Sequence, residues 1–317
     1  MAKKISKILL PIVFGGTILW WMYRDFDFNR IIDTLIHGMN WWWMALSLVF
    51  GITAQLFRGL RWKQTLSPLG ENPRTSTLIH AIFLSYTSSL IIPRSGEVVR
   101  CGVLTRYDGT SLTKSLGTVV TERIIDSLLI LLIAAIVFAF QLHTFLDFFS
   151  NTGTNFSMWL HTFTLTGWIV TILCGCIILF LAIIFICKFR SSKTITDLKA
   201  GIFSLKEVEN KWLFAFYTFA IWASYFLHFY IAFFCFDYTV NLGIMAALVA
   251  FIIGSFAVIV PTPNGMGPWH FAVKTILLLY GVATTHAETF VLIVWAVQTA
   301  LIPLLGVFSL LTIKKKY

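Results

Sequence analysis

The sequence predicts an all-α polytopic membrane protein, with six full transmembrane helices and two re-entrant helical hairpins arranged as two inverted-topology repeats. Composition is the first of three observations that lead there. Of the 317 residues, 58% are hydrophobic and only 12% are charged, with a mean hydropathy of +0.83, whereas an ordinary soluble domain carries about 25% charged residues. Long apolar runs and the placement of basic residues between them are the other two. Together they exclude a water-soluble globule.

Six apolar runs are long enough to cross a bilayer, which requires about 20 helical residues. They cover residues 7–23, 41–57, 115–140, 165–187, 212–236 and 287–312. The first run follows three lysines, as a signal peptide would, but Trp20 to Tyr23 stand where small cleavage-site residues belong. We therefore expect an uncleaved first span.

Two further apolar runs are broken by proline and glycine. Pro93 and Gly96 interrupt the first, and the segment from Pro261 to Pro268 interrupts the second. The broken runs and the short helices expected after them are 77–92 with 96–106, and 243–260 with 269–281. Eight ordinary spans with proline kinks are the alternative, because transmembrane helices tolerate proline and glycine.

The distribution of basic residues favours hairpins. Lysine and arginine accumulate in short cytoplasmic loops, and 20 of the 24 basic residues fall in segments on one side if the N-terminus is cytoplasmic. Those segments are 1–7, 58–76, 94–114, 188–211 and 314–316. The partition works only if each broken run enters and leaves on the same face. We expect a multi-pass protein of the cytoplasmic (inner) membrane with both termini cytoplasmic, whose net charge of +10 faces lipid headgroups and no nucleic acid.

The resulting order of segments is the same in both halves of the chain but inverted. Residues 1–140 form the first predicted repeat, with hairpin 77–106, and residues 141–317 form the second, with hairpin 243–281. Inverted repeats with broken helices at corresponding places are typical of transporters whose site lies near the membrane midplane.

Two amphipathic stretches are expected to lie flat on the membrane as connectors. Residues 25–39 and 194–208 place apolar side chains at helical spacing among polar ones. Three tryptophans at 41–43 fit an aromatic belt at the outer membrane surface.

The span 115–140 holds the richest cluster of ionisable residues. Glu122 and Asp126 are four residues apart on one helical face, and Arg123 is three from Asp126. An ionisable residue kept inside the bilayer is a functional hypothesis because its burial is costly. The alternative is a structural ion triad that braces the helices.

The first hairpin tip supplies groups complementary to these carboxylates. The half-helix after Gly96 would aim its positive end into the membrane, and Arg94 and Arg100 add donors suited to phosphate or carboxylate. With Glu97, they predict an anion site reached from the cytoplasm. Alternatively, Arg94 pairs with Glu97 or Asp126 and only fixes the hairpin. Arg58, Arg61 and Arg106 are expected to be headgroup or positive-inside residues.

The second tip combines flexible backbone with basic side chains. Asn264, Gly265 and Gly267 allow left-handed conformations and close backbone approach, and His270 and Lys274 lie on one face of the following half-helix. Helix packing for His270 and snorkelling of Lys274 are the alternatives. Gln298 is a possible partner or a bridge between helices.

Several motifs are absent from the sequence. It contains no Walker A loop, dinucleotide-binding glycine pattern, HExxH helix or nucleophile elbow, and its five cysteines lack zinc-ligand spacing. We expect a protein without cofactor or metal that is not an enzyme.

Three motifs in order resemble those of a known family. They are Pro93 to Arg100, Glu122 to Asp126 and Pro261 to Gly267, and they are similar to the successive motifs of the lysylphosphatidylglycerol synthase transmembrane-region family, also called flippase-like integral membrane proteins. In that family, multiple peptide resistance factors are associated with flipping aminoacylated phosphatidylglycerol, and other members accompany hopanoid synthesis or archaeal glycosylation.

Two departures from the family pattern bear on the substrate. Asn264 stands where the family usually has a second glycine, and His270 where it has a glutamate, so a cationic aminoacyl headgroup becomes less secure as the substrate. The resemblance does not extend to a soluble aminoacyl-transferase domain, so we do not expect lipid lysylation by this chain alone.

The resemblance and the residues together favour a lipid translocase for a phospholipid or polyprenyl-linked lipid. A non-transporting subunit that presents a lipid-linked precursor to a separate glycosyltransferase or lipid-modifying enzyme is the alternative. A third hypothesis, an intrinsic transferase, would need a general base, which only residues 122–126 offer.

Overall fold

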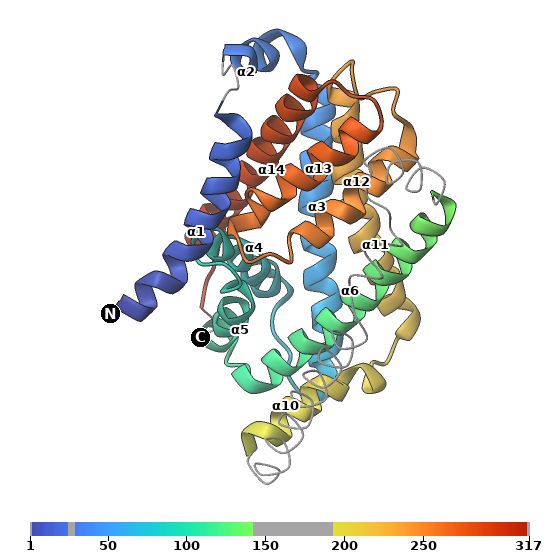
Figure 1. Cartoon of the computed structure of the whole chain (residues 1–317). Coiled ribbons are helices and arrows are strands. Elements are labelled where there is room, and N and C mark those ends of the chain that lie inside the picture. The colour runs from blue at the N-terminus through green and yellow to red at the C-terminus, as the bar shows by residue number, and fades with distance from the viewer. Residues whose placement is uncertain (1, 25–28, 142–192, 316–317) are drawn as a thin grey trace, which may run out of the picture.

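The computed structural model describes residues 2–24, 29–141 and 193–315, and every regular element in these ranges is a helix (Figure 1). The predicted all-α fold is therefore confirmed for the described residues. The predicted span 165–187 lies outside them.

Four helices are long and apolar enough to cross a membrane within the described part of the chain. They are α3 (Trp41–Leu66), α6 (Leu112–Phe140), α11 (Lys211–Tyr230) and α14 (Thr284–Thr312). Helix α1 (Ala2–Tyr23) covers the predicted first span. Asparagine side chains cap α3 and α11, because Asn40 accepts from the Trp42 N–H (3.1 Å) and Asn210 from the Leu213 N–H (2.9 Å). The four long helices match four of the six predicted spans and α1 lies over a fifth, while the complete arrangement of six spans and two re-entrant hairpins stays a prediction.

The two broken runs fold as helical hairpins. The first consists of α4 (Thr75–Ile91) and α5 (Gly96–Asp108), and the second of α12 (Gly243–Ala257) and α13 (Pro268–Leu279). Arg74 and Asp108 form an ion pair (2.7 Å) that joins the two ends of the first hairpin. A single kinked span would place those ends on opposite faces, so the first broken run turns back on itself.

The two hairpins occupy opposite halves of the molecule. In Figure 1 the α4–α5 hairpin lies in the lower half and the α12–α13 hairpin in the upper half. At about 1.5 Å per residue the four arms measure about 18 to 26 Å, shorter than the hydrocarbon core of about 30 Å. Their lengths suit helices that enter the bilayer without crossing it.

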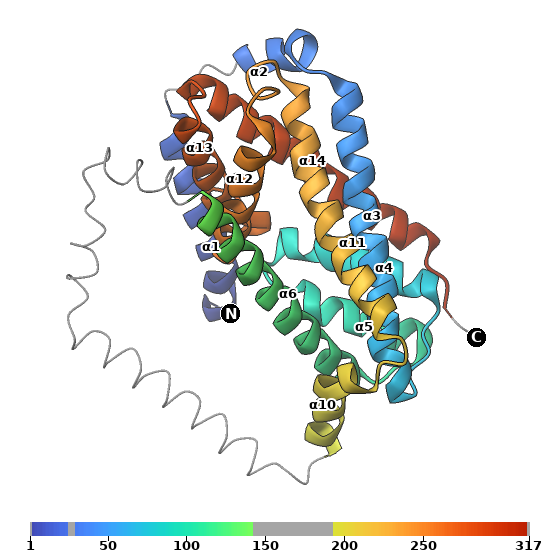
Figure 2. The ribbon, with the colours of Figure 1, turned by 90° about the vertical axis from the view of Figure 1, so that its right-hand side faces the viewer.

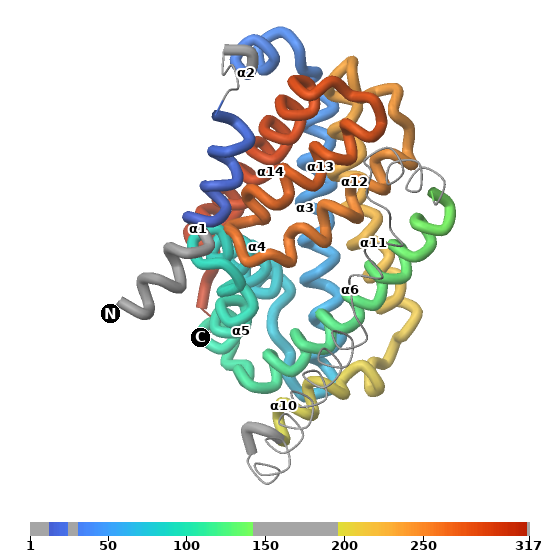
Figure 3. The backbone as a smooth tube through the Cα atoms, in the orientation of Figure 1, coloured from blue at the N-terminus to red at the C-terminus, as the bar shows by residue number. Residues whose placement is uncertain are grey.

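Each hairpin packs against the long helix that follows the other hairpin in the chain. Helix α4 contacts α14, α12 contacts α6, and α3 lies beside α11 (Figure 2). Within the hairpins, Gly96 and Gly254 permit close contact: a Cβ at Gly96 would collide with Ser85, and one at Gly254 would lie 2.9 Å from Nε1 of Trp269. The backbone path through both breaks can be followed in Figure 3. This packing leaves the predicted division into repeats 1–140 and 141–317 untested.

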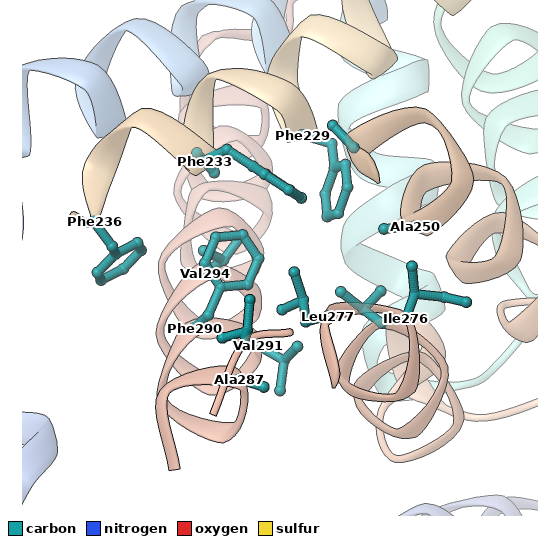
Figure 4. Packing of buried hydrophobic residues seen from close by; sticks show 14 of the residues in the cluster. Phe229, Phe233, Phe236, Ala250, Ile276, Leu277, Ala287, Phe290, Val291 and Val294 are labelled. Carbon is teal, nitrogen blue, oxygen red and sulfur yellow. The ribbon is translucent and has the colours of Figure 1, made fainter. Parts of the chain in front are cut away.

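Two apolar clusters hold the hairpins in place. The larger one surrounds α11 to α14, where Phe233 packs edge to face on Phe229 and Phe290 with ring centroids 5.4 and 5.1 Å apart (Figure 4). The smaller one joins α3, α4 and α5 around Trp62, which is fully buried. Each hairpin is therefore anchored on its own cluster.

Short helices form the connections at the two ends. Helix α2 (Asn29–Asp33) and the π-helical turn η1 (Thr34–Gly38) lie at the top in Figure 1, and α10 (Lys193–Phe203) with η3 (Ser204–Glu207) lies at the bottom. The remaining 3₁₀ turns are η2 (Ser67–Leu69), η4 (Ile231–Cys235) and η5 (Pro263–Gly265). Residues 29–38 of the first predicted amphipathic connector and residues 194–207 of the second are thus helical.

Candidate functional site

Two carboxylates of α6 are buried inside the helix bundle. Glu122 is 2% exposed and Asp126 7% exposed, one helical turn apart on one face. This placement confirms the shared face that their spacing predicts. Buried carboxylates need cationic or hydrogen-bonding partners, and in this fold arginines supply them.

Asp126 is bound by two arginines of α3. Arg61 donates from Nη1 to Oδ1 (2.8 Å) and from Nη2 to Oδ2 (3.1 Å), and Arg58 donates from Nη2 to Oδ2 (3.1 Å). Arg61 is fully buried and Arg58 is 6% exposed.

The expectation that Arg58 and Arg61 lie at the membrane surface is wrong. It rests on ending the second span at residue 57, whereas α3 continues to Leu66 and turns both side chains, three residues apart, toward α6. A signal for their true position was present in the sequence: two carboxylates inside a predicted span need more than one cation, and Arg123 supplies only one.

Glu122 is bound by Arg100 of α5. Arg100 donates from Nη1 to Oε2 (2.9 Å), and the Nε of Arg61 lies 3.9 Å from Oε1. The guanidinium of Arg100 also stacks over the Trp62 ring, 4.7 Å from its centroid. Helices α3, α5 and α6 thus meet at one buried ion cluster, defined here as Arg58, Arg61, Arg100, Glu122 and Asp126.

Arg123 lies outside this buried ion cluster. Its Nε pairs with Oε1 of Glu97 (2.6 Å), and the two side chains are 53% and 42% exposed. The predicted triad of Glu122, Arg123 and Asp126 does not form, because consecutive helix positions point about 100° apart and residue 123 faces outward. A cavity of about 400 Å³ adjoins the pair, lined by Glu97, Val120, Arg123, Ile124, Ser127 and Leu128.

Arg94 joins the tips of the two hairpins. Its Nη2 donates to the carbonyl oxygen of Ile259 (2.6 Å), just beyond the end of α12. Arg94 has a positive φ of 65°, a conformation that most side chains avoid. No ion pair of Arg94 with Glu97 or Asp126 is found in the described residues, so the pairing alternative is wrong, although Arg94 does fix the hairpin.

The start of α5 is capped from within its own hairpin. Ser89 of α4 accepts a hydrogen bond from the Gly96 N–H (3.1 Å), and Ser95 donates to Ser88 (3.1 Å). One of the backbone donors expected to face an anion is therefore already engaged.

The second tip is held by α14 and α1. Asn264, with a positive φ of 48°, donates from Nδ2 to Thr299 (2.7 Å), and its carbonyl accepts from Nε1 of Trp295 (3.0 Å). Gly265 and Gly267 have φ values of 71° and 87°. A Cβ at Gly267 would lie 2.7 Å from the Gly15 carbonyl, so the predicted need for close backbone approach is met by α1.

His270 and Lys274 have separate environments. His270 is fully buried among the rings of Tyr23, Trp269 and Trp295. Its Nδ1 accepts from the Gly267 N–H (3.4 Å), while its Nε2 has no hydrogen-bond partner.

Lys274 pairs with Glu288 of α14 (2.6 Å), a residue that the sequence analysis missed although it lies inside the predicted last span. Gln298 bonds neither His270 nor Lys274. It donates to Ser47 (2.9 Å) and to the His228 carbonyl (2.8 Å) and bridges helices.

The structure therefore separates the predicted residues into three groups. Arg100, Glu122 and Asp126 join the buried ion cluster, Glu97 and Arg123 line the cavity, and Arg94 and the residues from Asn264 to His270 lie at the hairpin tips. Lys274 lies apart from all three groups, paired with Glu288. Within the described ranges, no three histidine, cysteine, aspartate or glutamate side chains are grouped to hold a metal.

Comparison with known proteins gives two findings. Residues 8–306 match the sequence profile of the family described as the lysylphosphatidylglycerol synthase TM region. The chain is also 30% identical over 95 residues to the protein named glycosyltransferase AglD of Haloferax volcanii, which covers 30% of this chain and 15% of that protein. No solved structure matches the chain. Since the family match spans nearly the whole sequence, the chain belongs to the lysylphosphatidylglycerol synthase TM region family.

Proposed function

We propose that this protein is a membrane lipid translocase that moves a phospholipid or lipid-linked headgroup across the cytoplasmic membrane by alternating access. The observation that carries the proposal is the buried ion cluster of α3, α5 and α6, beside two broken hairpins whose tips are bonded through Arg94 and Ile259. Discontinuous helices that meet within the bilayer are how transporters build a polar site there. Charge buried at such depth indicates a functional site.

The first contact with a headgroup is assigned to the cavity beside Glu97 and Arg123. Because this ion pair is about half exposed, it is weak, and an anionic headgroup can replace Glu97 on the Arg123 guanidinium. Val120, Ile124 and Leu128 line the same cavity and offer an apolar surface to the acyl chains.

Passage across the membrane then follows from the two hairpins. Rocking of one hairpin against the other breaks the Arg94–Ile259 hydrogen bond and exposes the buried ion cluster to the opposite face. Since the sequence carries no nucleotide-binding motif, a lipid gradient, the membrane potential or a coupled proton must drive net transport. The candidates for proton coupling are Glu97, Glu122, Asp126 and His270.

The charge pattern sets the orientation of this proposal. The end of the molecule with α5, α10 and the last lysines is assigned to the cytoplasm, with both termini there, and the end with α2 to the outer surface. The headgroup would then enter from the cytoplasmic side.

Reconstitution with Arg123→Ala tests the translocase. We expect proteoliposomes with the native chain to move a fluorescent phospholipid between leaflets, and the variant to lose most of this activity while staying folded and retaining lipid. Arg106→Ala, which removes the same charge from an exposed position on α5, serves as the control. Absence of protein-dependent movement for every lipid offered, anionic or zwitterionic, would contradict the proposal.

A second candidate function is a non-transporting subunit that presents a lipid-linked precursor to a separate enzyme. The partial match to a protein named as a glycosyltransferase favours it. It predicts that Arg123→Ala lowers the activity of the partner enzyme without any lipid movement by the native chain. An intrinsic transferase is less favoured, because arginines already bind both buried carboxylates and oppose their use as a general base.

A further inference from the structure

The buried ion cluster contains one more positive than negative charge. Three guanidinium groups, those of Arg58, Arg61 and Arg100, face the two carboxylates of Glu122 and Asp126, and all five residues are at most 7% exposed. The neighbouring Arg123 and Glu97 neutralise each other. A net charge in a low-dielectric interior is costly unless a counter-ion joins it. The charge balance therefore suits one monovalent anion.

The excess charge can be assigned to Arg58. Arg100 has Glu122, and Arg61 holds both oxygens of Asp126 in a two-pronged contact. Arg58 reaches only Oδ2 of Asp126, through one nitrogen, and its Nε, like that of Arg61, has no hydrogen-bond partner. A guanidinium normally presents five N–H donors, so Arg58, which shares its one carboxylate with Arg61, keeps donors that Asp126 does not engage.

Two tyrosines add a donor beside Arg58. The hydroxyls of Tyr86 on α4 and Tyr225 on α11 are 2.7 Å apart, and the Arg58 guanidinium lies 5.7 Å from the Tyr225 ring centroid. When one hydroxyl donates to the other, the accepting hydroxyl keeps its own hydrogen for a further acceptor. Arg58, which shares the Asp126 carboxylate with Arg61, and this hydroxyl pair form a set of neighbouring donors.

We propose that this site selects a lipid whose headgroup is a phosphodiester with a net charge of minus one, its phosphate bound by Arg58 and the Tyr86–Tyr225 pair. The inference rests on the proposed function, because it names the substrate class of the same site. A phosphodiester brings one negative charge and oxygen acceptors only, which match the excess charge and the free donors.

Other headgroups match the cluster less well. A zwitterionic headgroup carries an ammonium group as well as its phosphate, so it leaves the excess positive charge of the cluster unneutralised. A phosphomonoester carries a charge of about −1.5 to −2 at pH 7 and leaves the cluster with net negative charge. The preference therefore follows from charge balance more than from headgroup shape.

Competitive lipid binding tests the proposal. The purified full chain in neutral detergent is incubated with equal amounts of dioleoyl phosphatidylglycerol, phosphatidylcholine and phosphatidic acid, and retained lipid is counted by native mass spectrometry. We expect phosphatidylglycerol to exceed phosphatidylcholine by at least about tenfold, equivalent to about 1.4 kcal/mol. Arg58→Gln should abolish this preference, and Arg106→Gln should leave it unchanged.

Two further variants keep the test decisive if Arg58→Gln does not fold. Tyr225→Phe keeps the ring and should lower phosphatidylglycerol retention without affecting phosphatidylcholine. Glu122→Gln raises the excess to two positive charges and should shift binding toward phosphatidic acid, whereas a purely structural role predicts equal losses for all lipids. Equal retention of the three lipids by the native chain would overturn the inference. Selective binding without lipid movement in proteoliposomes would instead contradict the translocase and leave the inference standing.

Discussion

Asp126 is the residue on which the buried ion cluster depends most, because two arginines share its carboxylate. Arg58 and Arg61 come from one helix and Asp126 from another, so the contact holds α3 against α6. The exposed pair of Arg123 and Glu97 lies within two helical turns of it and has the same chemistry in a wetter environment. Comparing substitutions at the two ion pairs therefore tests whether burial sets the contribution of such a pair to stability.

Asp126→Asn should destabilise the protein strongly. The substitution leaves the buried Arg58 without its carboxylate and Arg61 with only the 3.9 Å contact to Glu122, and breaking a buried ion pair costs about 3 to 5 kcal/mol. Arg123→Gln, the matched change at the exposed pair, should cost less than about 1 kcal/mol. Denaturant unfolding of both variants in detergent micelles measures the difference. Similar losses for the two variants would show that burial does not set the strength of these contacts.

The pair of Lys274 and Glu288 should respond to charge exchange. Glu288→Gln leaves a mostly buried lysine without its carboxylate, at a cost of about 1 to 3 kcal/mol. Exchanging the two residues, Lys274→Glu with Glu288→Lys, should restore most of that stability because the charges meet again between α13 and α14. Unfolding of the single and double variants forms the test, and a double variant no more stable than Glu288→Gln would refute an electrostatic role.

At the scale of elements, the close contact of α6 with α10 depends on two glycines. A Cβ at Gly117 would lie 2.5 Å from the Leu198 carbonyl, and one at Gly201 would lie 2.5 Å from the Lys114 carbonyl. Thr121 adds hydrogen bonds to the carbonyls of Gly201 and Ile202 (3.2 and 2.7 Å). The connector is therefore docked through backbone contacts that larger residues would prevent.

Alanine at Gly117 and at Gly102 should change stability in opposite directions. Gly102 lies in helix α5, where a Cβ would meet nothing within 4 Å, so Gly102→Ala should gain about 0.5 to 1 kcal/mol from helix propensity. Gly117→Ala should lose stability and make α10 more susceptible to limited proteolysis, because the helices must separate. Unfolding midpoints and protease digestion check both outcomes, and a stabilising Gly117→Ala would contradict the described contact.

At the scale of the whole molecule, the hairpins are the feature that distinguishes a re-entrant design from ordinary spans. Both arms of each hairpin pack together, and the tip of the first reaches the second through Arg94 and Ile259. The tips meet between the lower and upper halves seen in Figure 1. If the charge pattern sets the orientation, the base of each hairpin faces a different side of the membrane.

Cysteine labelling of intact cells tests this topology. In a background without the natural cysteines, a membrane-impermeant thiol reagent should label Thr284→Cys from outside and leave Arg106→Cys and Arg94→Cys unlabelled until the membrane is permeabilised. Arg106 is exposed near the end of the first hairpin, and Thr284 is the exposed first residue of α14, just after the second hairpin. Labelling of Arg106→Cys from outside would show that the first hairpin crosses the membrane and would exclude the mirrored arrangement, since Arg106 lies near the end of α5.

Local sequence patterns are enough to predict the class of protein, the approximate positions of the described helices and the buried face of α6. Apolar runs and the 3.6-residue period are local properties, and the breaks at Pro93 and at Pro261 to Pro268 are caused by residues that the sequence shows directly. For the same reason, the helical period alone places Glu122 and Asp126 on one face, without knowledge of which helix packs there.

Which charges pair depends on how the helices pack against one another. Helical periodicity assigns a residue to a face but does not say which helix packs on that face, so the pairing of Arg58 and Arg61 with Asp126, and of Lys274 with Glu288, followed from the packing of distant segments. Arg123 shows the same limit in reverse, because its neighbour in sequence is buried while it faces outward to Glu97. Ion pairs between helices depend on the rotation and register of both partners, which no local pattern contains.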